Sequence, residues 1–312
     1  MTLQSAPFHH DVSDGPDAQA YWVTADDGVR LRFAHWTQDG SKGTVLLFPG
    51  RTEYIEKYGR AAADFAKRGF GMVAIDWRGQ GLADRLVAPR YTGYVAKFTD
   101  YQRDVAAVCA ALKAIDAPKP WYLIGHSMGG CIGLRALMEG LPVAAAAFSG
   151  PMWGIHIDPW MRPAAWVLSA LSKPLGFGTK LAPGTSATTY VLDQAFDGNA
   201  LTKDADMYAY MQRQMTTHSD LSLAGPSLHW LYEALKECRH LAAQPSPDVP
   251  CMTFLGKDEQ IVDVPAIHDR MARWPNGTLD TIDAGEHEVM MEVPESRSHV
   301  FDASSTFFEQ HN

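Results

Sequence analysis

A serine flanked by glycines is the feature of this sequence that most clearly indicates chemistry. Residues 125–129 read Gly-His-Ser-Met-Gly and follow the apolar run 121–124. A serine on a sharp turn between a strand and a helix has strained backbone angles, and glycines beside it leave room for that turn. The pattern arises by chance in about one in ten chains of this size. Here, however, the preceding run is typical of a buried strand, and residues 131–139 have helical apolar spacing. The pattern therefore predicts Ser127 as a nucleophile.

A serine nucleophile needs a base and an acid that orients the base. His287 follows an expected strand at 278–282 and is the candidate base. The acid is expected after the preceding strand, 251–255, where the chain offers Asp258, Glu259 and Asp263. Of these, Asp263 is expected to cap the helix that begins near residue 265. His126, beside the serine, is expected to pack or hydrogen-bond locally, because adjacent residues on a tight turn point apart.

Two backbone N–H groups are expected to stabilise the negative charge that develops on the substrate oxygen. Met128, the residue after the serine, supplies one of them. The turn after the expected strand 44–48 supplies the other, and by position the donor is Arg51, because Pro49 has no N–H. Gly50 would let the substrate approach closely. The alternative reading of this Pro-Gly pair is a simple turn.

Alternating strands and helices are expected to position these residues. Two apolar segments flank Asp-Asp-Gly at 26–28, which indicates a hairpin near the start of the chain. Further strands are predicted at 44–48, 71–75, 121–124, 143–148, 251–255 and 278–282. Helices are predicted at 58–68, 100–115, 128–139, 265–274 and 295–310. The alternation predicts an α/β fold with a mostly parallel sheet, an antiparallel N-terminal hairpin and helices on both faces.

The segment 151–250 interrupts this alternation. It is too long for a structureless loop, so we expect a helical cap or lid inserted into an α/β core made of residues 1–150 and 251–312. The segment is rich in tryptophan, methionine and tyrosine. Each of these residues could belong to the core of a small helical subdomain, but together they indicate an apolar pocket wall for a hydrocarbon ligand. The candidate pocket residues are Gly50, Trp153, Trp160, Trp166 and Met211.

Composition argues against several classes of function. The 312 residues include 27 Lys and Arg and 36 Asp and Glu, for a net charge of −9. Without a basic cluster, we expect neither nucleic-acid binding nor electrostatic attachment to anionic lipid. Residues 1–7 do not have the pattern of a secretion signal and no apolar run reaches membrane-spanning length, so we expect neither secretion nor a membrane span; the spacing of the four cysteines predicts free thiols. A cytoplasmic location is expected, with any membrane contact transient, peripheral to the inner face and made through the lid.

The motifs resemble those of the serine hydrolases that include bacterial lysophospholipases and monoacylglycerol lipases, related to the S33 serine aminopeptidases. The resemblance covers nearly the whole chain. It rests on Phe-Pro-Gly-Arg-Thr-Glu-Tyr at 48–54, Asp-Trp-Arg-Gly-Gln-Gly at 76–81, the serine motif, Ile-Val-Asp at 261–263, and Gly-Glu-His-Glu at 285–288 with Glu292 and Arg297. The chain order serine, acid, histidine is that of α/β-hydrolases. Pro49 departs from the monoacylglycerol lipases, in which this turn usually begins with histidine.

The resemblance implies an α/β-hydrolase that cleaves the carboxylic ester of a single-acyl-chain lipid, a lysophospholipid or a monoacylglycerol, through an acyl-enzyme. It implies no metal or organic cofactor. It also implies Glu259 as the acid of the triad, because related proteins place this acid three residues after a glycine and one residue before an apolar pair. Asp258 remains the alternative, because aspartate is the more usual acid in such triads.

Three other functions remain open. The chain could be another kind of carboxylesterase of the same fold. It could be a peptidase that removes N-terminal residues, which would need an acidic cluster near the serine to bind a free amine. A non-catalytic lipid-binding protein is the third alternative, and it would not need an activated serine.

Overall fold

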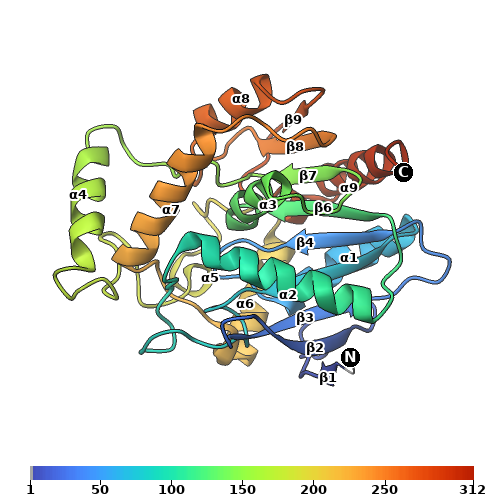
Figure 1. Ribbon diagram of the computed structural model, residues 1–312, viewed down its shortest axis with the longest axis horizontal. Helices are drawn as coiled ribbons and strands as arrows, with labels where there is room; N and C mark the ends of the chain where they lie inside the picture. The colour runs from blue at the N-terminus through green and yellow to red at the C-terminus, as the bar shows by residue number, and fades with distance from the viewer. Residues whose placement is uncertain (1–2) are drawn as a thin grey trace.

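A nine-stranded sheet forms the centre of the protein within residues 3–312, the part of the chain that this computed structural model describes (Figure 1). The strands are β1 (Gln4–Ser5), β2 (Gln19–Thr24), β3 (Arg30–Trp36), β4 (Thr44–Phe48), β5 (Gly71–Asp76), β6 (Trp121–His126), β7 (Ala146–Ser149), β8 (Cys251–Gly256) and β9 (Thr278–Ile282). Their order across the sheet is β1-β2-β3-β5-β4-β6-β7-β8-β9. Strands β1, β2, β3 and β5 pair antiparallel, and the pairs from β5 to β9 are parallel.

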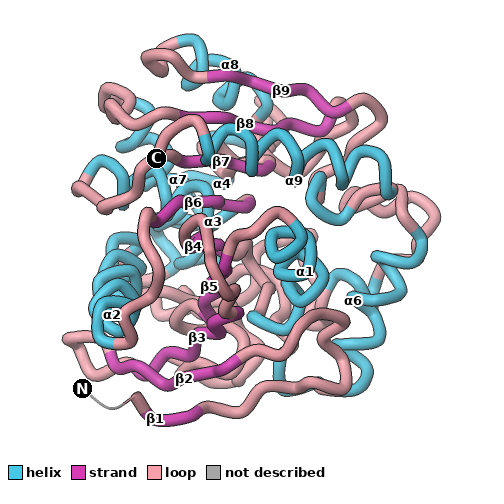
Figure 2. The backbone as a smooth tube through the Cα atoms, turned by 90° about the vertical axis from the view of Figure 1, so that its right-hand side faces the viewer, coloured by secondary structure: helices cyan, strands magenta, loops and turns pink. Residues whose placement is uncertain are grey.

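Helices cover both faces of this sheet. The α-helices are α1 (Gly59–Lys67), α2 (Tyr101–Ala114), α3 (Met128–Met138), α4 (Arg162–Ser172), α5 (Tyr190–Asp193), α6 (Ala205–Thr217), α7 (Leu228–Ala242), α8 (Val264–Ala272) and α9 (Pro294–Glu309). Short 3-10 helices are η1 (Ile55–Tyr58), η2 (Phe98–Asp100), η3 (Ser219–Leu221) and η4 (Val289–Met291). Figure 2 shows α2 on one side of the sheet and α1 and α9 on the other.

The alternation of side chains along β4 explains why both faces are covered. All five residues of this strand are buried. Leu46 and Phe48 belong to the apolar core on the side of α2 and α3, whereas Val45 and Leu47 belong to the core on the side of α1 and α9. A strand that buries both faces reads as a continuous apolar run, the same pattern that predicted a buried strand at 121–124, where all residues of β6 are buried.

The predicted α/β architecture is confirmed. The hairpin, the parallel strands and the five core helices all lie near their predicted positions. The largest difference is in β7, which begins at Ala146 rather than Val143, although it keeps its place between β6 and β8. No helix of the described residues is long and apolar enough to cross a lipid bilayer. All four cysteines are free.

Residues 151–250 lie between β7 and β8 and provide α4, α5, η3, α6 and α7. In the described chain they add no strand to the central sheet. Helices α4 and α7 pack together at one end of the molecule (Figure 1). Helix α6 packs through Met207 and Met211 in a cluster with Tyr54 and Met291 of the surrounding chain. The insertion is helical, and its treatment as a separate cap remains a prediction.

Candidate active site

The residues that the sequence singles out meet at the carboxyl ends of the parallel strands. Arg51 follows β4, Ser127 follows β6, Glu259 follows β8 and His287 follows β9. Strands β4, β6, β7, β8 and β9 are neighbours in that order. Parallel strands present their carboxyl ends at one edge of the sheet, where α/β proteins bind their ligands.

Ser127 lies on the strained turn that the sequence predicted. Its φ is 49° and its ψ is −118°, and it directly precedes the first residue of α3. A Cβ on Gly129 would lie 1.9 Å from the carbonyl oxygen of Phe48, and a Cβ on Gly125 would lie 2.9 Å from the carbonyl oxygen of Gly129. Only glycine therefore allows the start of α3 to pack this closely against β4.

Glu259 and His287 are joined by a short hydrogen bond. Nδ1 of His287 lies 2.6 Å from Oε2 of Glu259, and both side chains are buried. Oε1 of Glu259 accepts hydrogen bonds from the N–H groups of Ile261 and Val262 at 2.6 and 3.2 Å. The apolar pair that helped to identify the acid thus also fixes its orientation.

The charge state of Glu259 follows from these contacts. Burial alone raises the pKa of the Glu259 carboxyl, but His287 and the two N–H donors outweigh burial and hold this pKa below its ordinary value. Glu259 is therefore ionised at neutral pH and can stabilise an imidazolium on His287.

Asp258 and Asp263 occupy different surroundings. Asp258 is exposed and forms an ion pair with Lys203, away from His287. Asp263 lies at the N-cap position of α8, but its side chain makes no capping hydrogen bond and instead lies 3.3 Å from Nη2 of Arg162. Asp263 therefore occupies the expected N-cap position, but the expected capping hydrogen bond from its side chain is not made.

The two N–H groups expected at the oxyanion site have no acceptor within residues 3–312. These are the N–H groups of Arg51 and Met128. Gln80 holds the turn that contains Arg51: its Nε2 donates to the carbonyl of Gly50 at 3.1 Å, and its Oε1 accepts from the N–H of Thr52 at 3.0 Å. Thr52 has a φ of 69°, which is strained for a β-branched residue. The sequence marked the loop of Gln80 as a family motif without giving Gln80 this role.

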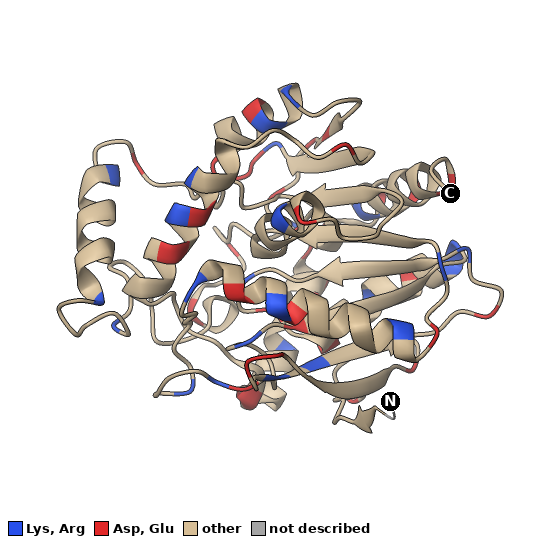
Figure 3. Ribbon diagram, viewed as in Figure 1, with Lys and Arg blue, Asp and Glu red and all other residues tan. Residues whose placement is uncertain are grey.

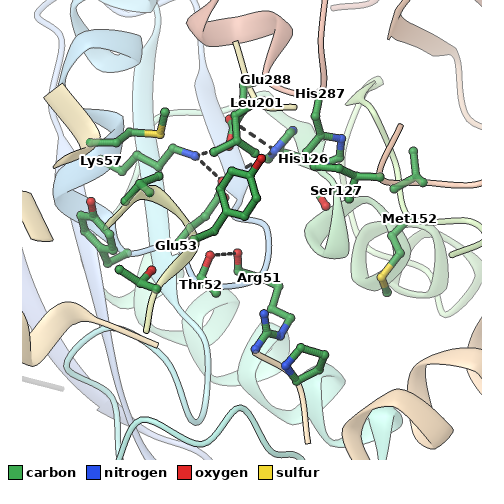
Figure 4. A pocket seen from close by; sticks show the side chains of 18 of the residues that line it. Arg51, Thr52, Glu53, Lys57, His126, Ser127, Met152, Leu201, His287 and Glu288 are labelled. Carbon is green, nitrogen blue, oxygen red and sulfur yellow. Dashed lines mark hydrogen bonds and ion pairs between the residues drawn. The ribbon is translucent and has the colours of Figure 1, made fainter. Parts of the chain in front are cut away.

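His126 makes the local contact that the sequence predicted and also joins a buried charged cluster. Its Nδ1 lies 3.0 Å from the carbonyl oxygen of Ser149. Its Nε2 lies 3.4 Å from Glu288 and 3.6 Å from Glu53, and the ammonium of Lys57 forms hydrogen bonds with both carboxylates. Figure 4 shows this cluster beside the serine.

The cluster shifts the pKa values of its members in opposite directions. Burial alone lowers the pKa of His126, but Glu288 and Glu53 outweigh burial and raise it. Burial alone raises the pKa of Glu288, but Lys57 and His126 outweigh burial and lower it well below its ordinary value. Glu53, His126 and Glu288 lie close enough together to bind a cation, and the Lys57 ammonium already contacts both carboxylates.

Glu53 connects the cluster to residues 49–52, the turn that contains Arg51 and is termed the oxyanion turn. Its Oε2 accepts hydrogen bonds from the N–H of Gly50 and from the hydroxyl of Tyr58. Glu288 connects the same cluster to the loop of His287, its neighbour in the chain. Glu53 lies four residues before Lys57, a spacing that could have suggested this pair, but nothing in the sequence pairs Lys57 with the distant Glu288, and sequence reasoning missed the cluster.

A cavity of about 280 Å³ joins these groups to the insertion. Ser127 and His287 both line it, and no hydrogen bond links their side chains (Figure 4). Such contacts are often long in unliganded enzymes and tighten when substrate binds. The insertion contributes Met211, Met215 and Trp230 to the lining. Met211 thus lines this cavity, and its contact with a substrate remains a prediction.

Two other predicted pocket residues do not line the cavity. Trp153 packs against Phe148 and Trp274, with ring centroids at 5.1 and 5.9 Å, and its Nε1 donates to the carbonyl of Gly130 at 3.2 Å. Gly50 is buried in the turn and does not contribute to the lining. Neither residue lines the cavity: Trp153 packs in the core, so its assignment to the pocket wall was wrong, whereas Gly50 lies in the turn beside Arg51 and its role in close approach of the substrate remains a prediction.

Trp160, just before α4, and Trp166, within α4, do not line the cavity. Trp160 is 78% exposed, and Trp166 packs edge-on against Tyr232, with ring centroids at 6.2 Å. Neither lines the cavity, so their predicted role in the pocket wall was wrong. Composition does not distinguish the inner side of a helical insertion from its outer side, because both are apolar here.

The chain matches known proteins over most of its length. Residues 39–294 match the family described as serine aminopeptidase, S33. The chain is 29% identical to lysophospholipase L2 of Escherichia coli strain K12, covering 93% of this chain and 87% of that protein. It is 25% identical to a probable lysophospholipase L2 of Haemophilus influenzae, covering 92% and 90%. The chain shares its fold with a soluble variant of monoglyceride lipase from Saccharomyces cerevisiae, solved in complex with a substrate analog. The TM-score is 0.74, with 20% identity and 98% coverage of both chains.

Proposed function

Because the chain belongs to the serine aminopeptidase S33 family and has the α/β-hydrolase fold, we propose that it hydrolyses the carboxylic ester of a single-acyl-chain lipid, a lysophospholipid or a monoacylglycerol. The observation that carries this proposal is the cavity lined by Ser127 and His287 on one side and by apolar cap residues on the other. The relatives named lysophospholipase L2 support the choice of lipid.

The proposed reaction is a two-step acyl transfer. Ser127 Oγ attacks the ester carbonyl while His287 Nε2 takes the hydroxyl proton, and Glu259 stabilises the resulting imidazolium through Nδ1. The N–H groups of Arg51 and Met128 hold the oxyanion. His287 then gives its proton to the leaving alcohol, which leaves an acyl-enzyme. Water attacks this ester in the same way and releases the fatty acid.

The peptidase alternative is disfavoured by the state of the acidic side chains. A free amino terminus would need carboxylates available in the cavity. Glu53 and Glu288 do line the cavity, but Lys57 already binds both of them and His126 lies beside both. An incoming ammonium would have to displace a buried lysine, which would leave that lysine without a partner.

We also propose transient peripheral contact with the inner face of the cytoplasmic membrane, and the outer surface of the insertion supports the contact with lipid. Helix α4 and its flanks expose an apolar set: Trp160, Met161, Val167, Leu168, Leu171 and Leu175. Figure 3 shows colour for charged residues only at the two ends of this helix. With a net charge of −9, contact with lipid would depend on apolar insertion.

The test is a substrate panel with one acyl chain. Lysophosphatidylcholine, lysophosphatidylethanolamine, monoacylglycerol and the p-nitrophenyl ester of the same fatty acid are compared for the wild type and for Ser127→Ala. We expect hydrolysis of at least one lipid by the wild type and none by the variant, together with stoichiometric fluorophosphonate labelling of Ser127. If only the p-nitrophenyl ester is hydrolysed, the carboxylesterase alternative replaces this proposal. Without labelling, the protein would be the non-catalytic lipid binder.

A further inference from the structure

Arg51 presents a cation to the cavity that no acidic side chain neutralises. Its side chain lines the same cavity as Ser127 and extends away from the serine (Figure 4). Within the described residues, no carboxylate oxygen lies within 4.0 Å of its guanidinium nitrogens. The other lysine or arginine of the lining, Lys57, is bound by two carboxylates. Arg51 therefore lacks a counterion at a site where ligand would enter.

Contacts with the insertion hold the Arg51 guanidinium in place. Nη2 donates to the carbonyl of Ala224, and Cζ lies 5.4 Å from the ring centroid of Trp230. Nε is buried and has no acceptor in the described chain. Burial lowers the pKa of Arg51 to about 10, so the group remains charged at neutral pH. Several of the five N–H donors of this guanidinium are thus left for another acceptor.

A charge that is partly removed from water without a counterion costs free energy, and a bound anion reduces that cost. We propose that the Arg51 guanidinium binds the phosphodiester of a lysophospholipid head group, while the Arg51 N–H holds the oxyanion. The proposal rests on the proposed function and makes lysophospholipids the preferred substrates over monoacylglycerols. Arginine suits this role because its planar fork pairs with two phosphate oxygens. A monoacylglycerol has no phosphate to bind.

The test compares two lipids with the same acyl chain in the Arg51→Met variant, which keeps the N–H and most of the packing volume. We expect the ratio of kcat/KM for lysophosphatidylcholine to kcat/KM for monoacylglycerol to fall by about tenfold to a hundredfold, the range for a lost hydrogen bond to a charged group. The fall should appear mainly in KM. Arg51→Lys should recover part of the ratio.

Arg85→Met is the matched control. Arg85 is also partly buried, its pKa is also lowered to about 10, and it also donates to a backbone carbonyl of the insertion, that of Asp220 at 3.3 Å. It does not line the cavity. Any effect of losing a contact between core and insertion should therefore appear in both variants. The fall in the ratio of the two kcat/KM values should appear only in Arg51→Met.

A second readout does not depend on lipid hydrolysis. Glycerophosphocholine should inhibit p-nitrophenyl butyrate hydrolysis more strongly than glycerol does in the wild type and in Arg85→Met, but not in Arg51→Met. The proposed phosphate site would be contradicted if glycerophosphocholine inhibited all three proteins equally. It would also be contradicted if Arg51→Met lowered kcat/KM equally for both lipids. If the wild type hydrolyses neither lipid, the proposed function fails, and the inhibition data still decide the role of Arg51.

Discussion

At the scale of single residues, the acid beside His287 is distinguished from its neighbour by contact alone. Glu259 and Asp258 are adjacent in the chain, yet one carboxylate lies 2.6 Å from Nδ1 of His287 and the other pairs with Lys203 near the surface. The longer glutamate side chain reaches the histidine while also accepting two backbone N–H groups.

We expect Glu259→Gln to lower kcat by roughly 10³ to 10⁴ with little change in KM, because the amide neither stabilises the imidazolium nor favours the correct tautomer. Asp258→Asn, which changes a neighbouring carboxylate in the same way, should leave kcat nearly unchanged. Steady-state kinetics with a soluble p-nitrophenyl ester measures both. A crippled Asp258→Asn enzyme beside a near-normal Glu259→Gln enzyme would move the acid to Asp258.

Gln80 controls the direction of a peptide N–H in the oxyanion turn. The carbonyl and the N–H of a trans peptide point in opposite directions. Because Gln80 binds the carbonyl of Gly50, it directs the N–H of Arg51, which belongs to the same peptide, away from itself.

Gln80→Met should therefore lower kcat by about tenfold to a hundredfold, somewhat less than removal of an oxyanion donor, while KM changes little. Gln102→Met is the control, since the Gln102 amide also donates to a backbone carbonyl, that of Ile132, at 3.1 Å. Kinetics of both variants on one ester gives the comparison. Equal kcat values for Gln80→Met and the wild type would show that the turn holds its orientation without Gln80.

At the scale of elements, the insertion has two apolar surfaces with different partners. The inner surface places Met211 and Trp230 in the cavity, and the outer surface exposes Trp160 and Leu175 around α4. The insertion is also bound near the active site, because the N–H groups of His287 and Glu288 donate to the carbonyls of residues 200 and 201.

Changes to the two surfaces should have separate effects. Met211→Ala should lower kcat/KM for long-chain esters more than for short ones, because each buried methylene contributes about 0.8 kcal/mol.

Trp160→Ser combined with Leu175→Ser should reduce liposome flotation at all salt concentrations and leave the chain-length profile unchanged. Tyr91→Ser changes an exposed aromatic outside α4 and serves as the control. Flotation that collapses with added salt would indicate a basic patch in place of apolar insertion.

At the scale of the whole molecule, one buried cluster connects segments that are far apart in the chain. Lys57 lies in η1, Glu53 lies in the turn after β4, His126 ends β6, and Glu288 lies in the loop after β9. The Lys57 ammonium bonds both carboxylates. The cluster thus fixes the turn that contains Arg51 and the loop that contains His287 relative to each other.

Lys57→Met should lower the free energy of unfolding by about 3–5 kcal/mol at neutral pH, because it leaves buried carboxylates without their partner. In the wild type, the depressed pKa of Glu288 stabilises the folded protein at pH values above the pKa that this carboxyl has in the unfolded chain. This stabilisation is lost as the pH falls through the lower pKa of the folded state. In the variant, loss of the Lys57 ammonium raises the pKa of Glu288, so the deficit should shrink from pH 8 to pH 5. Chemical denaturation across this range measures it, with Lys57→Met/Glu288→Gln expected to recover part of the loss. A deficit independent of pH would contradict this account.

The sequence by itself determined the parallel sheet, the turn at Ser127 and the place of His287. These features are encoded within short segments: a continuous apolar run for a strand buried on both faces, glycines where a Cβ would collide, and a histidine after the last strand. The tertiary structure decided the role of Gln80, the pairing of Lys57 with Glu288, and the surroundings of Trp160 and Trp166. Each of these depends on which distant segments meet when the chain folds, and neither composition nor local spacing carries that information.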